Sequence, residues 1–284
     1  MEFLDNPALD QFINTALKED LQDGDHSSLA AIPEHTKNKA QLLIKGEGII
    51  AGLSLASKIF KTFDPELNIE MLLKDGSQVA YGDIGFYVSG SARSILSTER
   101  LVLNCMQRMS GIATYTNYLN GLIAGTKAKL LDTRKTTPNF RMCEKWAVVI
   151  GGGVNHRFGL YDMIMLKDNH IDYAGGITKA VRAVHNYLAE KKLNLKIEVE
   201  TRNISEVEEA LSVGGVDRIM LDNMQPEIMK KAVSLIGGQC ESEASGGITE
   251  KTIHSVAETG VDFISVGALT HSVKSMDISL KAVK

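Results

Sequence analysis

The spacing of apolar residues along the chain changes character near residue 112. Before that point, it predicts a helix over residues 8–21, short strands over 39–52, a helix over 53–63 and further strand over 78–90, with Asp75-Gly76 as a turn. Ser97 is the predicted N-cap of a long helix that runs through Ile112. Gly111 lies inside that helix, where glycine is unfavourable, and therefore indicates close packing or a bend. These elements predict a small α/β domain over residues 1–112.

From about residue 114 onward, short apolar runs alternate with helical patterns. We predict strands over 129–132, 163–166, 196–200, 218–221, 239–243 and 262–266. The helices between them include one over 178–190, one opened by a capping box at Ser205–Glu208 and one capped by Thr249 that stops at Gly260. Such alternation is typical of a parallel sheet or barrel. We predict an irregular α/β barrel over residues 113–284, whose C-terminal tail can pack back on the first domain; a doubly wound open sheet is the alternative.

Bulk composition narrows the class of protein. Of the 284 residues, 44% are hydrophobic and 23% charged, which is ordinary for a globular chain and excludes disorder. The net charge of −4 argues against a general binder of nucleic acid or membrane surfaces, so an anionic substrate needs a local cationic site. Cys105, Cys143 and Cys240 form no CxxC pair and favour reduced thiols. With no signal-peptide pattern and no apolar run of ~20 residues, we expect a soluble cytoplasmic protein.

Polar residues follow nearly every predicted strand of the second region. They are Thr133, Arg134 and Lys135; Lys167, Asp168 and Asn169; Glu200; Asp222 and Asn223; Ser245, Gly246 and Gly247; and Gly267 and Ala268. The C-terminal ends of barrel strands meet at one mouth, where such enzymes carry their active sites. This recurrence predicts an enzyme.

Cationic residues are concentrated in one segment of this acidic protein. They are Arg134, Lys135, Arg141, Lys145, Arg157 and Lys167, with His156 among them. Arginine binds carboxylates and phosphates through two parallel hydrogen bonds, and lysine supplies a point charge. We expect Arg141 and Lys145 to be surface residues, whereas Arg134, Lys135 and Lys167 stand at strand ends that converge on one cavity.

Carboxylates and glycines complete the predicted mouth. Strand alternation puts Glu198 and Glu200 on one face, directed into the barrel, where Asp222 from the next strand can join them. Their partners are either the cations or a partly hydrated Mg²⁺ that carries substrate phosphates; a purely structural ion pair is the alternative. The loops Ser245-Gly246-Gly247 and Gly267-Ala268 can present backbone N–H groups to a phosphate, although a Gly-Gly pair is also common in simple turns.

These residues carry a resemblance to a known family. The stretch from Asp132 to Ile171, DTRKTTPNFRMCEKWAVVIGGGVNHRFGLYDMIMLKDNHI, closely resembles the core of the quinolinate phosphoribosyltransferases. So do STERLVLNCMQRMSGIAT from Ser97, EVETRN, IMLDNM, ASGGI, GVDFISVGALTHS and the opening segment EDLQDGDHSS. The opening segment departs from the family pattern at His26-Ser27-Ser28, where Ile-Thr-Ser is common. The resemblance covers essentially the whole chain.

The resemblance implies a fold and a reaction. The fold is an N-terminal α/β sandwich joined to an irregular α/β barrel, in homodimers whose active sites combine both subunits. The reaction joins quinolinate and phosphoribosyl pyrophosphate, in the presence of Mg²⁺, to give nicotinate mononucleotide, pyrophosphate and CO₂, a step of NAD biosynthesis.

The resemblance also implies roles for individual residues. Arg134, Lys135, His156, Arg157 and Lys167 would line the quinolinate pocket, and Arg100 would reach it from the partner subunit. Glu200 and Asp222 would hold the Mg²⁺-bound ribose and pyrophosphate, and with Lys135 they would be the catalytic residues. The 5′-phosphate and the rest of the substrates would be held by Thr133, Ser245, Gly246, Gly247, Val266, Gly267 and Ala268.

Three other interpretations stay open on the sequence. One is a paralogous pyrophosphorylase of the same fold with another acceptor, such as the type associated with molybdate-transport operons. Another is a barrel aldolase with Lys135 or Lys167 as Schiff-base lysine. The third is a non-catalytic barrel that serves as an interaction scaffold.

Overall fold

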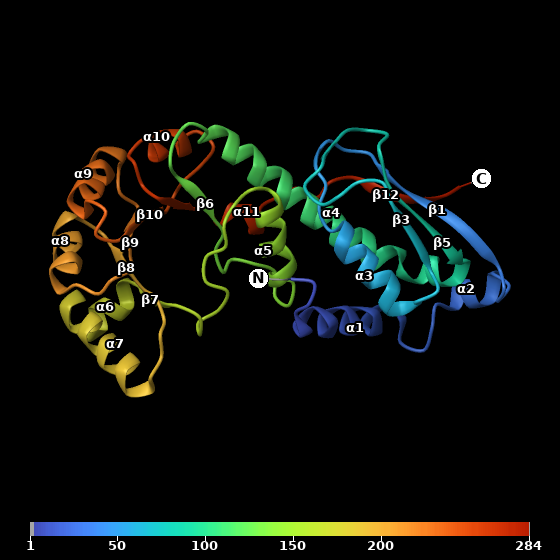
Figure 1. Ribbon diagram of the computed structural model, residues 1–284, viewed down its shortest axis with the longest axis horizontal. Helices are drawn as coiled ribbons and strands as arrows, with labels where there is room; N and C mark the ends of the chain where they lie inside the picture. The colour runs from blue at the N-terminus through green and yellow to red at the C-terminus, as the bar shows by residue number, and fades with distance from the viewer. Residues whose placement is uncertain (1–2, 284) are drawn as a thin grey trace. The chain divides into compact units, whose positions relative to one another are not determined.

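The computed structural model describes residues 3–283, which pack into two compact units (Figure 1). One unit comprises the residues up to Asn117, Lys135–Gly152 and the residues from Ala268 onward, and the other comprises Tyr118–Arg134 and Gly153–Gly267. Each compact unit is therefore formed by segments that are not continuous along the chain. Within residues 3–283, no helix is both long enough and apolar enough to cross a membrane.

The first unit is built on an antiparallel sheet with strand order β12-β1-β5-β3. Its strands are β1 (Lys37–Ile44), β3 (Asn68–Met71), β5 (Ile84–Ser91) and β12 (Ile278–Ala282), with a small separate pair formed by β2 (Gly48–Ile49) and β4 (Gln78–Val79). Leu42 of β1 lies opposite Leu280 of β12. The tail of the chain thus forms an edge strand of the N-terminal sheet.

Helix α3 (Leu53–Phe63) is amphipathic, and its apolar face is buried. The ring of Phe60 packs edge-on against Phe86 of β5, with a centroid distance of 5.8 Å, and both side chains are fully buried. This is the core of the first unit. The unit's other helices are α1 (Pro7–Leu21), α2 (His26–Ala31), most of α4 (Ala92–Leu122), α5 (Arg141–Ile150) and α11 (Ala268–His271).

Helix α4 begins earlier than predicted. It follows β5 directly at Ala92, so Ser97 lies inside the helix and the predicted N-cap is wrong. The Ser97 hydroxyl instead donates to Asp25, the residue whose carboxylate caps α2. The prediction for Gly111 is confirmed as close packing: a Cβ there would lie 2.3 Å from the carbonyl oxygen of Lys274.

The second unit contains a parallel six-stranded sheet with the order β6-β11-β10-β9-β8-β7. Helices α8 and α9 lie on the outer side of β8, β9 and β10 (Figure 1). Among the described residues, no pairing joins the two outermost strands, so the barrel is irregular and incomplete. The elements are β6 (Lys129–Leu131), β7 (Ile164–Leu166), α6 (Asp168–Ala174), α7 (Ile177–Lys191), β8 (Ile197–Thr201), α8 (Ile204–Val213), β9 (Arg218–Asp222), α9 (Pro226–Ile236), β10 (Glu241–Ser245), α10 (Ile253–Ala257) and β11 (Phe263–Ser265).

The predicted fold class is confirmed, whereas two predicted helix starts are wrong. Helix α8 is capped by Asn203, whose side chain accepts the amide of Glu206, so Ser205 already lies within the helix. Residue Thr249 forms a turn with Thr252, which leaves α10 as a short helix beginning at Ile253. In both cases, two polar residues that can cap a helix lie close together near its start. The local sequence pattern alone does not show which of the two is the cap.

Candidate active site

The C-terminal ends of the parallel strands in the second unit gather most of the predicted site residues. Neighbouring strands run in register, so their ends lie along one edge of the sheet. The second unit contains Thr133, Arg134, His156, Arg157, Lys167, Glu200, Asp222, Ser245, Gly246, Gly247, Val266 and Gly267. The other three predicted site residues, Arg100, Lys135 and Ala268, belong to the first unit.

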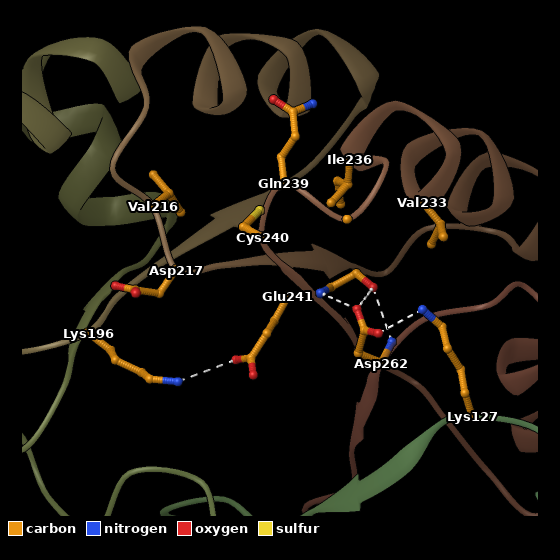
Figure 2. A pocket seen from close by; sticks show the side chains of 12 residues that line it. Lys127, Lys196, Val216, Asp217, Val233, Ile236, Gln239, Cys240, Glu241 and Asp262 are labelled. Carbon is orange, nitrogen blue, oxygen red and sulfur yellow. Dashed lines mark hydrogen bonds and ion pairs between the residues drawn. The ribbon is translucent and has the colours of Figure 1, made fainter.

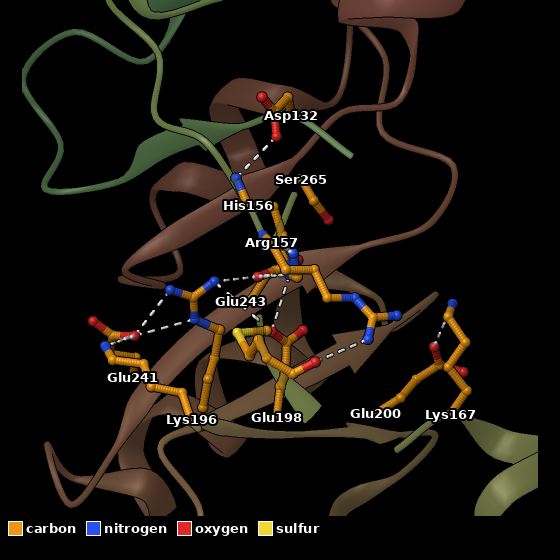
Figure 3. A network of polar contacts seen from close by, with 12 residues as sticks. Asp132, His156, Arg157, Lys167, Lys196, Glu198, Glu200, Glu241, Glu243 and Ser265 are labelled. Carbon is orange, nitrogen blue, oxygen red and sulfur yellow. Dashed lines mark hydrogen bonds and ion pairs between the residues drawn. The ribbon is translucent and has the colours of Figure 1, made fainter. Parts of the chain in front are cut away.

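Strand β8 carries two buried carboxylates on one face of the sheet, as the alternation of its residues predicted. Glu198 is fully buried and Glu200 is 7% exposed. The Glu200 carboxylate lies 3.3 Å from the Lys167 ammonium and accepts the main-chain N–H of Asp168 at 3.4 Å. The ion pair holds the Glu200 carboxylate and the Lys167 ammonium side by side at the C-terminal ends of β8 and β7 (Figure 3).

Positive charge is concentrated around Arg157. Its half-buried guanidinium donates to the carbonyl oxygen of Met163 at 3.2 Å. Burial, followed by the positive charge of Arg134, lowers the pKa of Arg157, although the guanidinium stays protonated at neutral pH. The carboxylates of Glu198 and Asp162 act in the opposite direction, but they do not fully offset burial and the repulsion from Arg134. The segment is therefore suited to a small ligand with more than one carboxylate.

The residue that follows β9 packs tightly against the glycine loop of Ser245, Gly246 and Gly247 at the end of β10. The N–H of Asn223 donates to the carbonyl of Ser245 at 2.8 Å, and Asn223 itself has a positive φ of 53°. Gly246 has φ of +91°, and a Cβ there would lie 2.3 Å from Asn223 Oδ1. The positive φ favours glycine at this position, and any side chain there would have to displace Asn223. A glycine loop of this kind can present backbone N–H groups to a ligand at close range.

A buried polar network connects side chains of β8, β9 and β10 with His156 (Figure 3). His156 Nε2 lies 3.0 Å from Glu198 Oε2 and 3.5 Å from Glu243 Oε2. Arg218 donates to Glu243 at 2.9 Å and to Glu241 at 2.9 Å. The network joins neighbouring strands β8, β9 and β10 through charged side chains.

Arg218 neutralises much of this buried negative charge. Burial alone would lower the pKa of Arg218, but the carboxylates of Glu243 and Glu198 raise it above its ordinary value. The guanidinium also stacks over the Phe263 ring at 4.2 Å. The ligand atoms of His156, Glu198 and Glu243 lie within 4.8 Å of one another, close enough for a metal. However, Arg218 already supplies the cation there.

A cavity of about 480 Å³ lies at the opposite, N-terminal ends of these strands (Figure 2). Its charged residues pair within the wall: Lys127 with Asp262 at 2.7 Å, and Lys196 with Glu241 at 3.8 Å. Burial raises the pKa of the Cys240 thiol, which makes it a weak nucleophile. This end of a barrel usually serves stability rather than catalysis.

Comparison with known proteins places the chain in a family. The sequence model described as "Quinolinate phosphoribosyl transferase, N-terminal domain" matches residues 25–110, and that of the C-terminal domain matches residues 112–281. The chain belongs to the quinolinate phosphoribosyltransferase family. The family predicted from the sequence and its enzyme class, the pentosyltransferases, are thereby confirmed.

Relatives from distant organisms extend along nearly the whole chain. A nicotinate-nucleotide pyrophosphorylase (carboxylating, chloroplastic) from Oryza sativa subsp. japonica is 50% identical over 95% of this chain and 76% of its own length. A probable nicotinate-nucleotide pyrophosphorylase (carboxylating) from Bacillus subtilis is 41% identical over 96% of this chain and 92% of its own. The crystal structure of NadC from Streptococcus pyogenes has a TM-score of 0.90 at 40% identity, covering 97% of each chain.

Some features of this family member were not predicted from its sequence. Lys145 was expected on the surface, yet it is only 1% exposed, on the buried face of amphipathic helix α5. Arg218 and Glu243 were not singled out at all. The signal was present, because the alternation in Glu241-Ser-Glu-Ala-Ser245 places Glu243 on the same face as Ser245, as the alternation in β8 does for its two glutamates.

The buried Glu243 should make stability depend on pH. Burial, and then the charge of Glu198, raise the pKa of Glu243 from 4.5 to about 7, while His156 and Arg218 act in the opposite direction. The folded protein thus holds Glu243 protonated below about pH 7 and as a carboxylate above it. This contribution to the free energy of unfolding is fully present below the unfolded pKa of 4.5 and is lost as the pH rises through about 7.

Between pH 5 and pH 8, the wild type should therefore lose ~2–3 kcal/mol of stability relative to Glu243→Gln, which cannot ionise. Urea unfolding of both proteins at several pH values measures the difference. A difference that stays constant with pH would show that Glu243 keeps its ordinary pKa in the fold.

Proposed function

We propose that this chain transfers the phosphoribosyl group of phosphoribosyl pyrophosphate to quinolinate and releases CO₂, giving nicotinate mononucleotide and pyrophosphate for NAD biosynthesis. The observation that carries the proposal is the arrangement at the C-terminal strand ends of the second unit, where cations, carboxylates and a glycine loop share one edge. Membership of the family and the names of its relatives support the same reaction.

Quinolinate is a pyridine with two adjacent carboxylates, so its binding requires several cations in a small space. We assign this role to Arg134, Arg157 and Lys167, together with Lys135. Arg157 and Arg134 supply concentrated positive charge, and the Lys167–Glu200 pair sets the position of the ammonium. Forked guanidinium donors suit carboxylates in particular.

Glu200 and Asp222 fit a Mg²⁺ site of the type that shares its ion with substrate. They stand on neighbouring strands β8 and β9, where Glu200 pairs with Met220, two residues before Asp222 on the same face. Both offer hard carboxylate oxygens, and Mg²⁺ commonly binds one or two carboxylates and completes its shell with waters and phosphates. When bound, the ion would neutralise charge on the departing pyrophosphate.

The side chains of the chain then have separable tasks in the reaction. The ring nitrogen of quinolinate bonds to the ribose carbon while the bond from that carbon to pyrophosphate breaks. Positive character on the ribose is stabilised by the carboxylates of Glu200 and Asp222. The ribosylated, positively charged ring nitrogen next stabilises the electron pair that stays on the neighbouring ring carbon when its carboxylate leaves as CO₂. A proton from water then replaces the lost group at that carbon. The sequence of bond changes requires no covalent enzyme intermediate.

The 5′-phosphate is assigned to the glycine loop of Ser245, Gly246 and Gly247, with Gly267 nearby on the next strand end. Gly246→Ala should raise KM for phosphoribosyl pyrophosphate by about 10- to 100-fold, because its Cβ would displace Asn223 and the loop by roughly 1 Å. Steady-state kinetics with varied phosphoribosyl pyrophosphate measure this.

Gly238→Ala is the matched control for the glycine prediction. Gly238 also has a positive φ, of 78°, but a Cβ there would meet nothing within 4 Å. Both variants place alanine at a positive φ, but only the Cβ of Gly246→Ala would meet Asn223, so KM should rise only in Gly246→Ala. Equal KM values in the two variants would remove the loop from the phosphate site.

We further propose that the enzyme works as a homodimer in which Arg100 enters the partner's site. Arg100 is exposed on α4, in keeping with a role outside its own fold. Mixing inactive Arg100→Ala and Arg157→Ala proteins after dissociation should restore activity, with up to about a quarter of the sites intact if subunits pair at random. No recovery in a mixture shown to contain mixed dimers would place Arg100 outside the shared site.

A cytosolic location is also part of the proposal. It is supported by the free thiols of Cys105, Cys143 and Cys240, two of them buried. Relatives in plants are named chloroplastic or mitochondrial. Fractionation of cells expressing the native protein decides between these compartments.

The reaction is tested by incubating purified protein with quinolinate, phosphoribosyl pyrophosphate and Mg²⁺, while nicotinate mononucleotide and CO₂ are followed. Nicotinate serves as the control acceptor and Arg134→Ala as the control protein. Product from quinolinate alone, absent with the variant, supports the proposal. Product from nicotinate but not from quinolinate would instead favour a paralogous pyrophosphorylase.

A further inference from the structure

The imidazole of His156 is held at both ring nitrogens by the protein itself. Its Nδ1 accepts the main-chain N–H of Arg157 at 2.7 Å. An amide N–H can only donate, so Nδ1 carries no proton, and the single proton of the neutral ring is on Nε2. The geometry thus selects one tautomer.

That proton points at two buried carboxylates. Nε2 lies 3.0 Å from Glu198 Oε2 and 3.5 Å from Glu243 Oε2, and both glutamate side chains are fully buried. The main-chain N–H of His156 also donates to Asp132 Oδ1 at 2.9 Å. The segment that carries Arg157 is therefore anchored to Asp132, which directly follows β6, and to β8 and β10 (Figure 3).

The carboxylate pair is costly to the fold. Within residues 3–283, Oε1 of Glu198 and Oε1 of Glu243 are buried and have no hydrogen-bond partner. Two carboxylates share one main counter-charge, Arg218, which lies 2.9 Å from Glu243 and 3.8 Å from Glu198. Apolar residues of similar size would commonly give equal or greater stability in such a place. A role in shaping the site accounts for the arrangement better than stability does.

We propose that Glu243 and Glu198 are positioning residues for substrate binding. They fix the Nε2–H tautomer of His156, which leaves Nδ1 able to accept the main-chain N–H of Arg157. This hydrogen bond holds the Arg157 backbone in place and so directs its guanidinium toward quinolinate. His156 accordingly serves as a neutral link between the carboxylates and Arg157, and the substrate's charge is met by the arginines and lysines. The inference rests on the proposed function, because it assigns Arg157 to quinolinate.

The kinetic test compares two glutamates of the same strand. Glu243→Met and Glu241→Met each remove one carboxylate bonded to Arg218, but only Glu243 faces His156. We expect Glu243→Met to raise KM for quinolinate by about 10-fold, as is typical when an orienting partner is lost, while KM for phosphoribosyl pyrophosphate stays within about 2-fold. Glu241→Met should change neither. If both KM values rise together in Glu243→Met, its role is structural and the proposal fails.

Two substitutions of His156 distinguish the role of Nδ1 from the role of Nε2. Asn places a carbonyl oxygen near Nδ1 and keeps the acceptor for the Arg157 amide, whereas Gln places its amide near Nε2 and loses that acceptor. KM for quinolinate should be about 10-fold higher in His156→Gln than in His156→Asn. The reverse order would assign the function to Nε2 and overturn the proposal.

A spectroscopic measurement tests the tautomer without turnover and does not depend on the activity of any variant. Wild-type protein labelled with ¹⁵N-histidine should show, at pH 7.5, an unprotonated Nδ1 and a protonated Nε2 for the one signal missing in His156→Asn. Two protonated nitrogens would mean an imidazolium and would refute the proposal. An inactive wild type with the expected tautomer would refute only the proposed reaction.

Discussion

Arg157→Ala should lower kcat/KM for quinolinate by about 10²- to 10³-fold, as expected when one partner of a desolvated charge pair is removed. The guanidinium of Arg157 is half-buried, and burial and Arg134 lower its pKa by more than Glu198 and Asp162 raise it, so a bound carboxylate would stabilise its charge. Loss of this group should weaken quinolinate binding and leave KM for phosphoribosyl pyrophosphate nearly unchanged. Steady-state kinetics with each substrate varied in turn measure the two effects separately.

Two further variants sharpen this result. Arg157→Lys keeps the charge but not the forked donors, so it should fall between wild type and Arg157→Ala. Arg182→Ala removes an exposed arginine from α7 and should behave as wild type. If Arg157→Ala changed kcat/KM no more than Arg182→Ala does, quinolinate would bind elsewhere.

Glu200→Gln should lower kcat by about 10²- to 10³-fold, because it removes a preorganised negative charge from the site where the ribose becomes cationic. It also deprives Lys167 of its carboxylate partner, which lies 3.3 Å away. If Glu200 contributes to the Mg²⁺ site, the Mg²⁺ concentration that gives half-maximal activity should rise as well. Both quantities follow from initial rates measured over a range of Mg²⁺ concentrations.

Glu206→Gln is the control for charge removal near the same strand. The Glu206 carboxylate, on α8, pairs with Arg202 at 2.8 Å and is not one of the predicted site residues. This variant should keep both kcat and the Mg²⁺ dependence of the wild type. A Glu200→Gln enzyme with unchanged kcat would contradict the assignment of the ribose and metal to this carboxylate.

Much of the second unit was predictable because its strands are short apolar runs with polar ends. Every predicted strand there overlaps an observed one, and the alternation of Glu198 and Glu200 on β8 is present. Parallel strands bring their ends to one edge, so a list of strand ends is already a list of neighbours. The residues at this edge of the sheet could therefore be predicted from the sequence pattern alone.

What the sequence could not reveal depends on partners far away in the chain. Glu243 matters through Arg218 and His156, which pattern along β10 does not identify. Lys145 has the sequence signature of a surface lysine, yet it is buried. Gly111 was recognised as unusual, but the carbonyl of Lys274 that explains it lies 163 residues later. Local patterns describe an element, whereas its contacts are set by the assembled fold.

The pairing of β12 with β1 has a consequence for how the protein is made. The strand partner of residues 40–44 is the segment 278–282, so the first sheet lacks an edge strand until almost the whole of this sequence has left the ribosome. The second unit, by contrast, consists of segments that are all translated before residue 268. Domains generally fold as units during synthesis, N-terminal first. Here, the later-starting unit can finish folding before the earlier one, and a nascent chain stalled near residue 270 would expose an unpaired β1 edge, the kind of surface that promotes aggregation.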